Sequence, residues 1–342
     1  MKPTNYNNKS RVQKRKAKHK TRKRIFWILV PLLFLAGATS VYGAYIYNKA
    51  ADAADGSYNP LERDKVDQEN SSDEKKSDKS KENVSILFIG VDASKKRGTN
   101  GNALSDALIL ATLNREDKSV KMLSIPRDSY VYIPEVGYKD KITHAHAYGG
   151  PQATIETVEQ LFDIPIDYYV KMNFNAFIDV VDALDGITVD VQKEVWEQNS
   201  KDVKNAIHLL PGEQELNGEE ALALARTRKM DNDIQRGLRQ QQILKAIIDK
   251  GTSLGSIFKI DNVIDAVGNN METNMKFSEM KNLASYGAKG KIDIESFTLK
   301  GYDYWPEDVY YYQLDEEDLA EKKQMLQSHL QLDNQQTESS TE

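Results

Sequence analysis

Residues 221–240, ALALARTRKMDNDIQRGLRQ, place four arginines in a stretch that otherwise has the composition of two helices: Arg226, Arg228, Arg236 and Arg239. The first helix has a start signal, because Asn217 and, three residues later, Glu220 form a capping-box pattern. Arg226 and Arg228 are two positions apart and would point in opposite directions within one helix. Their side chains converge only where that helix ends.

The second helix spans residues 231 or 233 to 251 and carries an arginine in an unusual position. Counting back in steps of four from the apolar Ile248 and Leu244 leads to Gln240 and then Arg236, so the buried stripe becomes polar at its N-terminal end. Backbone N–H groups at a helix N-terminus already favour anions. An inward-facing arginine beside them predicts a phosphate site.

A structural explanation of the same arginines is also open. In it, Asp231 and Asp233 pair with Arg236 and Arg228 in a network that only stabilises the fold. Several arginines gathered around one helix N-terminus favour the anion-binding interpretation for the set.

A second group of charged residues lies upstream. Asp92 ends the first predicted strand, Asp106 begins the next, and Arg127 follows the third in SIPRD. If these strand ends share one edge, two carboxylates suit Mg²⁺ or Mn²⁺, which commonly bridges protein carboxylates to substrate phosphates. The alternative is that both Asp residues are turn or cap residues. Residues 144–146, HAH, suggest zinc less well, because no third ligand has suitable spacing.

The elements that position these residues alternate between strands and helices. Strands are predicted at 85–92, 106–113, 120–126, 167–174 and 187–191, and helices at 150–162 and 175–184. The polar turn NREDKS joins the second and third strands, which predicts an antiparallel hairpin. The fold class is therefore α/β, with a mixed β-sheet flanked by helices.

The N-terminal part of the 342-residue chain has a different composition from the rest. Residues 1–24 contain eleven Lys or Arg and no acidic residue, and residues 25–47 contain no charge and are long enough to cross a bilayer as a helix. Positive residues remain on the cytoplasmic side, which predicts a single-pass anchor with the remainder of the chain outside the cell membrane. The basic tail needs no nucleic-acid partner to explain it.

The rest of the chain divides by composition. Residues 48–82 are polar and charged and are expected to form a flexible extracellular linker. One domain is expected at 83–320, followed by a polar C-terminal tail at 321–342. The chain has no cysteine, which excludes disulfides, thiolate metal sites and a cysteine nucleophile.

Several motifs occur together in the chain, in the order GVD, SDALIL, LSIPRDSYV, DKITHAHAYGG, TVEQLFDIPIDYYVKMNF, LNGEEALALARTRK and DIQRGLRQQ. With these motifs in this order, the chain resembles the LytR-CpsA-Psr family over about residues 83–320. The resemblance is strongest to members that attach teichoic acid to peptidoglycan in Gram-positive bacteria. Such members move a glycopolymer from a polyprenyl-pyrophosphate carrier to the muramoyl 6-hydroxyl of peptidoglycan and form a phosphodiester.

The resemblance also implies roles for residues. Asp92 and Asp106 match the metal-binding pair, which with Arg127 forms the implied catalytic set. The residues that match the pyrophosphate-contacting set are Arg127, Arg226, Arg228, Arg236 and Gln240. One departure is Leu104, where many members have an arginine; the residues that offer a substitute are Lys95, Lys96 and Arg97 in the preceding loop.

The lipid carrier needs an apolar groove, and two helix faces offer one: Phe177, Val181 and Leu184 on the first, Leu244 and Ile247 on the second. Such faces form the core in most proteins. Two other functions stay open. The same site with water as acceptor would be a polyprenyl-pyrophosphate hydrolase, and a non-catalytic regulatory binding protein would need no such set of Asp and Arg residues.

Overall fold

The computed structural model describes residues 43–65, 83–92, 103–227, 233–252, 263–266, 271–287 and 292–332. The chain forms two compact units, residues 1–50 and 51–342. In the first unit, residues 43–50 are helical. None of the described helices combines the length and the apolar character needed to cross a membrane. Most of the predicted anchor, residues 25–42, lies outside the described part of the chain.

A six-stranded sheet forms the centre of the second unit, in the order β11-β6-β1-β2-β3-β12. Its strands are β1 (Val84–Val91), β2 (Ser105–Asn114), β3 (Ser119–Ser124), β6 (Tyr168–Asn173), β11 (Met271–Thr273) and β12 (Asp293–Thr298). β2 pairs antiparallel with both β1 and β3, which confirms the predicted hairpin. β6 runs parallel to β1, and β12 runs parallel to β3. The sheet is therefore mixed, as the sequence predicted.

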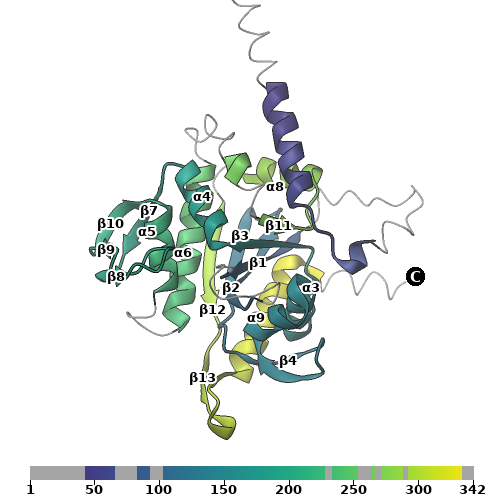
Figure 1. Ribbon diagram of the computed structural model, residues 1–342. Helices are drawn as coiled ribbons and strands as arrows, with labels where there is room; N and C mark the ends of the chain where they lie inside the picture. Colours follow the sequence, from purple (N-terminus) through teal and green to yellow (C-terminus); the bar gives the residue numbers. More distant parts are fainter. Residues whose placement is uncertain are drawn as a thin grey trace, which may run out of the picture. The chain divides into compact units, whose positions relative to one another are not determined.

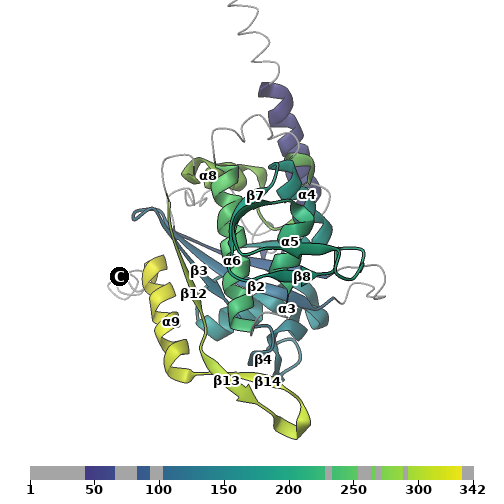
Figure 2. The same cartoon turned by 90° about the vertical axis from the view of Figure 1, so that its left-hand side faces the viewer.

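Helices cover both faces of this sheet (Figures 1 and 2). Because side chains alternate along a strand, neighbouring residues of β1 enter different cores. Leu87 and Ile89 pack with α3 (Ile142–Phe162) and α9 (Glu316–Leu330). On the other face, Phe88 lies in a cluster with residues of α6 (Asp233–Gly251), while Ile86 packs with residues of α8 (Phe277–Gly287).

Smaller elements surround the sheet. The helices α4 (Phe174–Ala183) and α5 (Gly218–Arg226) lie beside α6, next to the paired strands β7 (Ile187–Val191) with β10 (Gly212–Leu216), and β8 (Val195–Glu197) with β9 (Ile207–Leu209). Two further hairpins are β4 (Tyr130–Ile133) with β5 (Tyr138–Lys141), and β13 (Gly301–Tyr304) with β14 (Tyr311–Leu314). The helix predicted at 150–162 begins earlier, at Ile142, across a kink at Gly149 and Gly150.

Part of the segment expected to be a linker belongs to the domain. Within 48–82, residues 51–57 and 62–65 are helical, and Leu61 is only 5% exposed in the main core. Tyr58 bridges Thr273 of β11, and Arg63 forms an ion pair with Glu159 of α3 at 2.7 Å. The few apolar residues of this polar segment fix it to the sheet edge. Residues 66–82 lie outside the described residues.

The expected polar tail at 321–342 is also partly wrong, because α9 continues to Leu330. Leu326 and Leu330 are four residues apart on one face of this helix and are buried against the sheet. His329 is buried beside them, with Nδ1 2.7 Å from the Thr112 hydroxyl and Nε2 2.9 Å from the Ser119 hydroxyl. The high charge of α9 belongs to its outer face, so composition alone concealed its buried stripe.

Candidate active site

Strand order brings the upstream charged residues to one edge of the sheet. Asp92 follows the end of β1 and Asp106 lies at the start of the antiparallel β2, so both occupy the same edge. Arg127 follows the end of β3, and Asn173 ends β6, which runs parallel to β1. The register shifts between Gly90 and Val91, because Val91 pairs with Ser105 and Gly90 with Ala107. Asp106 is the extra residue of this β-bulge.

Arg127 and Asp106 are fixed against each other. An Arg127 guanidinium N–H donates to Asp106 Oδ1 at 2.7 Å, a charge-assisted hydrogen bond. Arg127 Nε lies 3.7 Å from an oxygen of Asp128, which in turn pairs with Lys141 Nζ at 2.8 Å. The backbone N–H of Thr143 donates to the Arg127 carbonyl oxygen. These contacts hold the guanidinium at the sheet edge.

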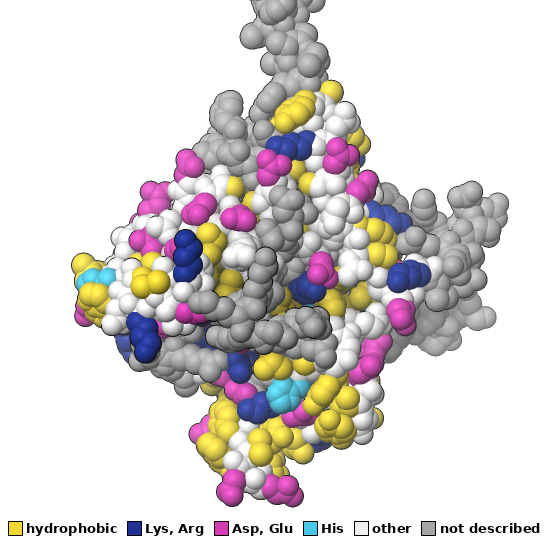
Figure 3. All heavy atoms as spheres, viewed as in Figure 1, with side chains coloured by type: hydrophobic (Ala, Val, Ile, Leu, Met, Phe, Trp, Pro, Cys, Tyr) yellow, Lys and Arg dark blue, Asp and Glu magenta, His cyan; other side chains and the backbone are white. Residues whose placement is uncertain are grey.

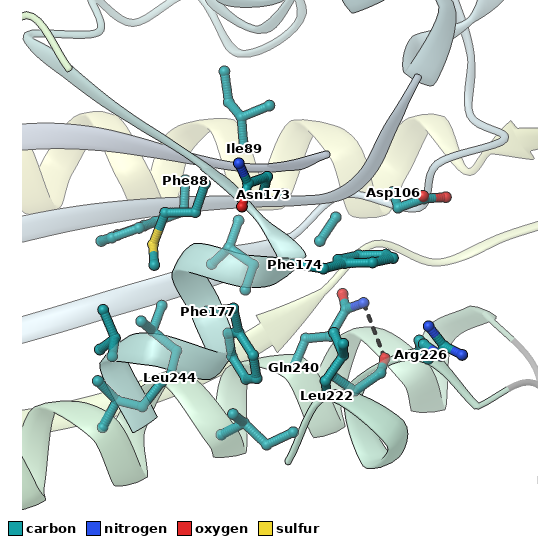
Figure 4. Close-up of a pocket in the computed structure, with 18 of the residues that line it drawn as sticks. Phe88, Ile89, Asp106, Asn173, Phe174, Phe177, Leu222, Arg226, Gln240 and Leu244 are labelled. Atoms are coloured by element: carbon teal, nitrogen blue, oxygen red, sulfur yellow. Dashed lines mark hydrogen bonds between the residues drawn. The ribbon is translucent and has the colours of Figure 1, made fainter. Parts of the chain in front are cut away.

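The predicted end of the first arginine helix is confirmed. The capping box of Asn217 and Glu220 begins α5, and Arg226 is its last residue. The Arg226 guanidinium donates to the carbonyl oxygens of Gln198 and Asn199 at 3.2 and 3.1 Å and lies over the Phe174 ring. Figure 4 shows Arg226 and Phe174 on the same side of the cavity as Asp106. Arg228 lies outside the described residues.

The predicted polar end of the α6 stripe is present as well. Arg236 is 6% exposed, and its guanidinium forms an ion pair with Asp233 at 3.0 Å. The structural explanation, in which an arginine pairs with Asp231 or Asp233, therefore applies to Arg236. Gln240 donates its side-chain N–H to the carbonyl oxygen of Ala225 at 3.2 Å (Figure 4). Arg239 instead donates to the carbonyl oxygens of Leu224 and Thr227 at the end of α5. It has a structural role at that helix terminus.

One cavity of about 690 Å³ joins the two groups of charged residues. Its polar lining includes Asp92, Asp106, Glu197, Gln198, Arg226, Arg236 and Gln240. The rest of its wall is largely apolar, with contributions from Phe88, Val170, Phe174, Phe177, Leu222, Leu244, Ile247 and Ile248. Figure 4 shows Phe88 of the sheet, Phe177 of α4, Leu222 of α5 and Leu244 of α6 around this cavity. The cavity therefore has a charged part beside a long apolar part.

The expected groove residues divide between this cavity and the core. Phe177, Leu244 and Ile247 line the cavity, whereas Val181 and Leu184 are buried in separate hydrophobic clusters. Helical periodicity marked both faces as apolar but could not tell which one borders an open space.

Four of the lining residues that sequence reasoning missed lie where a strand ends. Asn173 caps α4 by accepting a hydrogen bond from the Ala176 N–H at 2.9 Å, and Phe174 follows it. An Asn between a strand and a helix is a usable signal for such a position. Glu197 and Gln198 come at the end of the three-residue strand β8, which carries no sequence pattern of its own.

The donor set permits a divalent cation of a particular kind. Within the described ranges, no group of three or more His, Asp or Glu side chains is placed to hold a metal. Asp92 and Asp106 nevertheless supply two carboxylates beside an arginine-lined space, and Mg²⁺ is often held by one or two carboxylates together with phosphate oxygens and water. The residues therefore fit a cation that the substrate helps to coordinate.

The two histidines of the HAH stretch have different partners. His144 Nδ1 lies 2.7 Å from Asp140, while His146 Nδ1 lies 2.7 Å from the carbonyl oxygen of Ala103. Burial lowers the pKa of His146.

Leu104, where many members of the family have an arginine, is 38% exposed. The loop residues that could replace that arginine are Lys95, Lys96 and Arg97, and they lie outside the described residues.

The chain belongs to the LytR_cpsA_psr family, which it matches over residues 44–328. It is 44% identical over 322 residues to the polyisoprenyl-teichoic acid–peptidoglycan teichoic acid transferase TagT of Bacillus subtilis, covering 94% of this chain and 98% of that protein. Its fold matches TagT bound to LI-WTA with a TM-score of 0.65 at 45% identity, over 75% of this chain and 94% of the other. It also matches TagT with bound octaprenyl pyrophosphate lipid, with a TM-score of 0.61 at 42% identity, over 75% of this chain and 93% of that chain.

Proposed function

We propose that this protein is a phosphotransferase that moves an anionic glycopolymer, of the teichoic acid type, from a polyprenyl-pyrophosphate carrier to the muramoyl 6-hydroxyl of peptidoglycan. The observation that carries the proposal is the single cavity in which Arg226, Arg236 and Asp106 adjoin an extended apolar wall. A lipid pyrophosphate requires that combination. The named activity of the TagT relative and its lipid-bound structure support the same assignment.

The reaction needs charge stabilisation more than a nucleophilic side chain. The acceptor oxygen attacks the phosphorus that bears the glycopolymer, the bond from that phosphorus to the bridging oxygen breaks, and its electron pair leaves with polyprenyl phosphate. The acceptor proton passes to a base. Arg226 and Arg236 orient the pyrophosphate and stabilise the charge that develops on the leaving group, while Arg127 positions Asp106.

Asp92 and Asp106 would hold Mg²⁺ or Mn²⁺ at the sheet edge. The cation would offset negative charge on the phosphate oxygens. The paired Arg127 guanidinium limits the directions from which Asp106 can coordinate, because one carboxylate oxygen already accepts its hydrogen bond at 2.7 Å.

We infer that the reaction takes place at the outer face of the cytoplasmic membrane. The basic residues 1–24 and the uncharged residues 25–47 support a single-pass anchor with its N-terminus inside. External protease added to wall-stripped cells is expected to release a fragment that begins within residues 48–82, and complete protection would contradict this topology.

The decisive experiment incubates the full-length chain in detergent with lipid-linked donor, glycan oligomers and Mg²⁺ and identifies the products by mass spectrometry. Formation of a glycan phosphodiester supports transfer, whereas release of free phosphorylated glycopolymer with glycan present indicates hydrolysis. Donor binding without any product indicates a regulatory binding protein. Arg226→Ala is expected to abolish most turnover, and Lys250→Ala, which removes a surface cation paired with Glu215, is the matched control.

A further inference from the structure

A second, smaller cavity lies next to the charged end of the first. Its volume is about 300 Å³, and its lining includes Pro126, Asp233, Tyr302, Asp303, Tyr310 and Tyr312. It combines tyrosine rings with carboxylates, and unlike the larger cavity it has no extended aliphatic wall. Its most exposed ring is that of Tyr302, which is 59% exposed.

Two direct connections join this cavity to the candidate active site. Pro126 precedes Arg127, whose guanidinium holds Asp106. Asp233 pairs with Arg236 at 3.0 Å, and Arg236 lines the larger cavity. The two spaces therefore lie on either side of the same Arg236–Asp233 ion pair, so a molecule in the smaller one approaches the pyrophosphate site without entering the apolar part.

The hairpin β13–β14 is firmly attached to the loop that carries Arg127. The Tyr312 N–H donates to the Asp128 carbonyl oxygen at 2.8 Å, and Tyr312 also bridges Ser129. Gly301 permits the close pairing of β13 with β14, because a Cβ there would lie 2.2 Å from the Gln313 carbonyl oxygen and 2.8 Å from a Tyr312 ring carbon. The wall of the smaller cavity is thus held in a fixed position relative to the active-site edge.

Aromatic side chains extend from this cavity over the surface of two hairpins. Trp305 is 62% exposed, and its ring centroid lies 4.9 Å from that of Tyr310. The ring centroid of Tyr130 of β4 lies 5.7 Å from that of Tyr304 and 4.7 Å from that of Tyr311. Figure 3 shows hydrophobic side chains gathered with acidic ones at this end of the molecule. A contiguous exposed patch of this kind marks an interaction site. We call it the aromatic surface.

The chemistry of the aromatic surface suits sugar rings. Aromatic faces carry partial negative charge and attract the C–H groups on the faces of a pyranose. Carboxylates such as Asp303 and Asp233 accept hydrogen bonds from its hydroxyls. The tip of the hairpin also carries Glu307 and Asp308, which repel an anionic lipid surface and the polyanionic donor chain.

We propose that the smaller cavity and the aromatic surface bind the glycan of the acceptor and present its hydroxyl to the donor phosphorus. This inference rests on the proposed transferase function and assigns it a separate acceptor site. The lipid part of the donor occupies the apolar part of the larger cavity, its pyrophosphate lies at the charged edge, and the acceptor enters from the opposite side of the Arg236–Asp233 pair.

The test compares Tyr302→Ala and Trp305→Ala in the full-length chain in detergent. Each is expected to raise the KM for glycan oligomers about tenfold, the loss that corresponds to one aromatic contact, while donor affinity stays unchanged. Tyr302→Phe keeps the ring and should behave as wild type. Trp196→Ala removes an exposed tryptophan from the β8–β9 hairpin and is the matched control. Unchanged KM values in both Ala variants would overturn the acceptor site.

Two further measurements separate the possible failures. Direct binding of muramoyl-containing oligosaccharides can be measured without turnover. If the wild type binds them and Tyr302→Ala does not, the glycan site is supported. If the wild type also transfers no glycopolymer, the transferase function is refuted and the glycan site is retained. In phosphatidylglycerol vesicles containing brominated lipid, the difference in fluorescence quenching between wild type and Trp305→Phe reports lipid contact by this ring. Strong quenching of Trp305 with unchanged glycan binding would identify the patch as a membrane contact and overturn the proposal.

Discussion

Gly237 controls how closely α6 approaches the sheet, and Gly237→Ala tests whether that approach positions Arg236. A Cβ at residue 237 would lie 2.3 Å from Ser124 Oγ and 2.9 Å from Ser124 Cβ. Carbon atoms in good contact are about 3.5–4.0 Å apart, so helix and strand must separate by roughly 0.6–1.1 Å even if the Ser124 hydroxyl rotates away from the new Cβ. Arg236 and Gln240 move with the helix.

The expected effects on stability and on activity differ in size. Overpacking costs about 1–3 kcal/mol, but alanine regains about 1 kcal/mol of helix propensity over glycine, so the free energy of unfolding should fall by only about 0–2 kcal/mol. A displacement of about 1 Å at a reacting group can lower the rate about a hundredfold. Gly237→Ala should therefore fold and lose most of its turnover.

The assay measures urea unfolding, donor affinity and turnover of the full-length chain. Gly251→Ala is the matched control, because it lies on the same helix and a Cβ there meets nothing within 4 Å. Ser124→Gly removes both clashing atoms, so the double variant Ser124→Gly/Gly237→Ala should recover activity relative to Gly237→Ala, whereas Ser124→Ala should rescue less. Wild-type turnover in Gly237→Ala, or no rescue by Ser124→Gly, would refute the positional role of α6.

Three other predictions address charge. Asp92→Asn and Asp106→Asn should each abolish most turnover without unfolding the protein, as Mg²⁺ titration and calorimetry can check. Arg236→Ala should weaken donor binding about ten- to a hundredfold, through loss of a charge-assisted contact, whereas Asp233→Asn should leave donor affinity unchanged. Equal losses of donor affinity in the two variants, measured by calorimetry, would mean that Arg236 only stabilises the fold. Burial lowers the pKa of His329 to about 4 from 6.5. Between these two pH values the His329 side chain is protonated in the unfolded chain but neutral in the folded protein, so the free energy of unfolding falls as pH drops from 6.5 towards 4. At pH 5 the loss is about 2 kcal/mol, and urea unfolding of His329→Gln should lack this component.

The parts of the site that local patterns could predict share a property: each depends on one element and its immediate neighbours. The position of Arg236 follows from the period of α6, and the common edge of Asp92 and Asp106 follows from a strand followed by its antiparallel partner. The pairing of Arg236 with Asp233 was open from sequence, because one helical turn allows either an ion pair or an inward-facing ligand.

Apart from Asn173, which has a local capping signal, the parts of the site that sequence reasoning missed depend on contacts between distant segments. β12 joins the sheet parallel to β3, and the hairpin that follows it reaches Asp128 only because of this pairing. Gln198 reaches the cavity from a short strand that is placed by packing on α5. No local periodicity encodes such contacts. The end of the domain was misplaced for a related reason, since the buried stripe of α9 is narrow within a highly charged segment.

The bulge at Asp106 has a consequence for how this strand tolerates changes in length. Along a regular strand, side chains point alternately to the two faces of the sheet. One inserted or deleted residue therefore moves every side chain beyond it to the opposite face. At Asp106 the ladder already contains an unpaired residue, since Gly90 pairs with Ala107 and Val91 with Ser105. The direction of the carboxylate is therefore set independently of the alternation that Leu108 and Leu110 require for the core. The core can be repacked by substitution without turning Asp106, but loss of a single residue here would restore regular pairing and remove that independence.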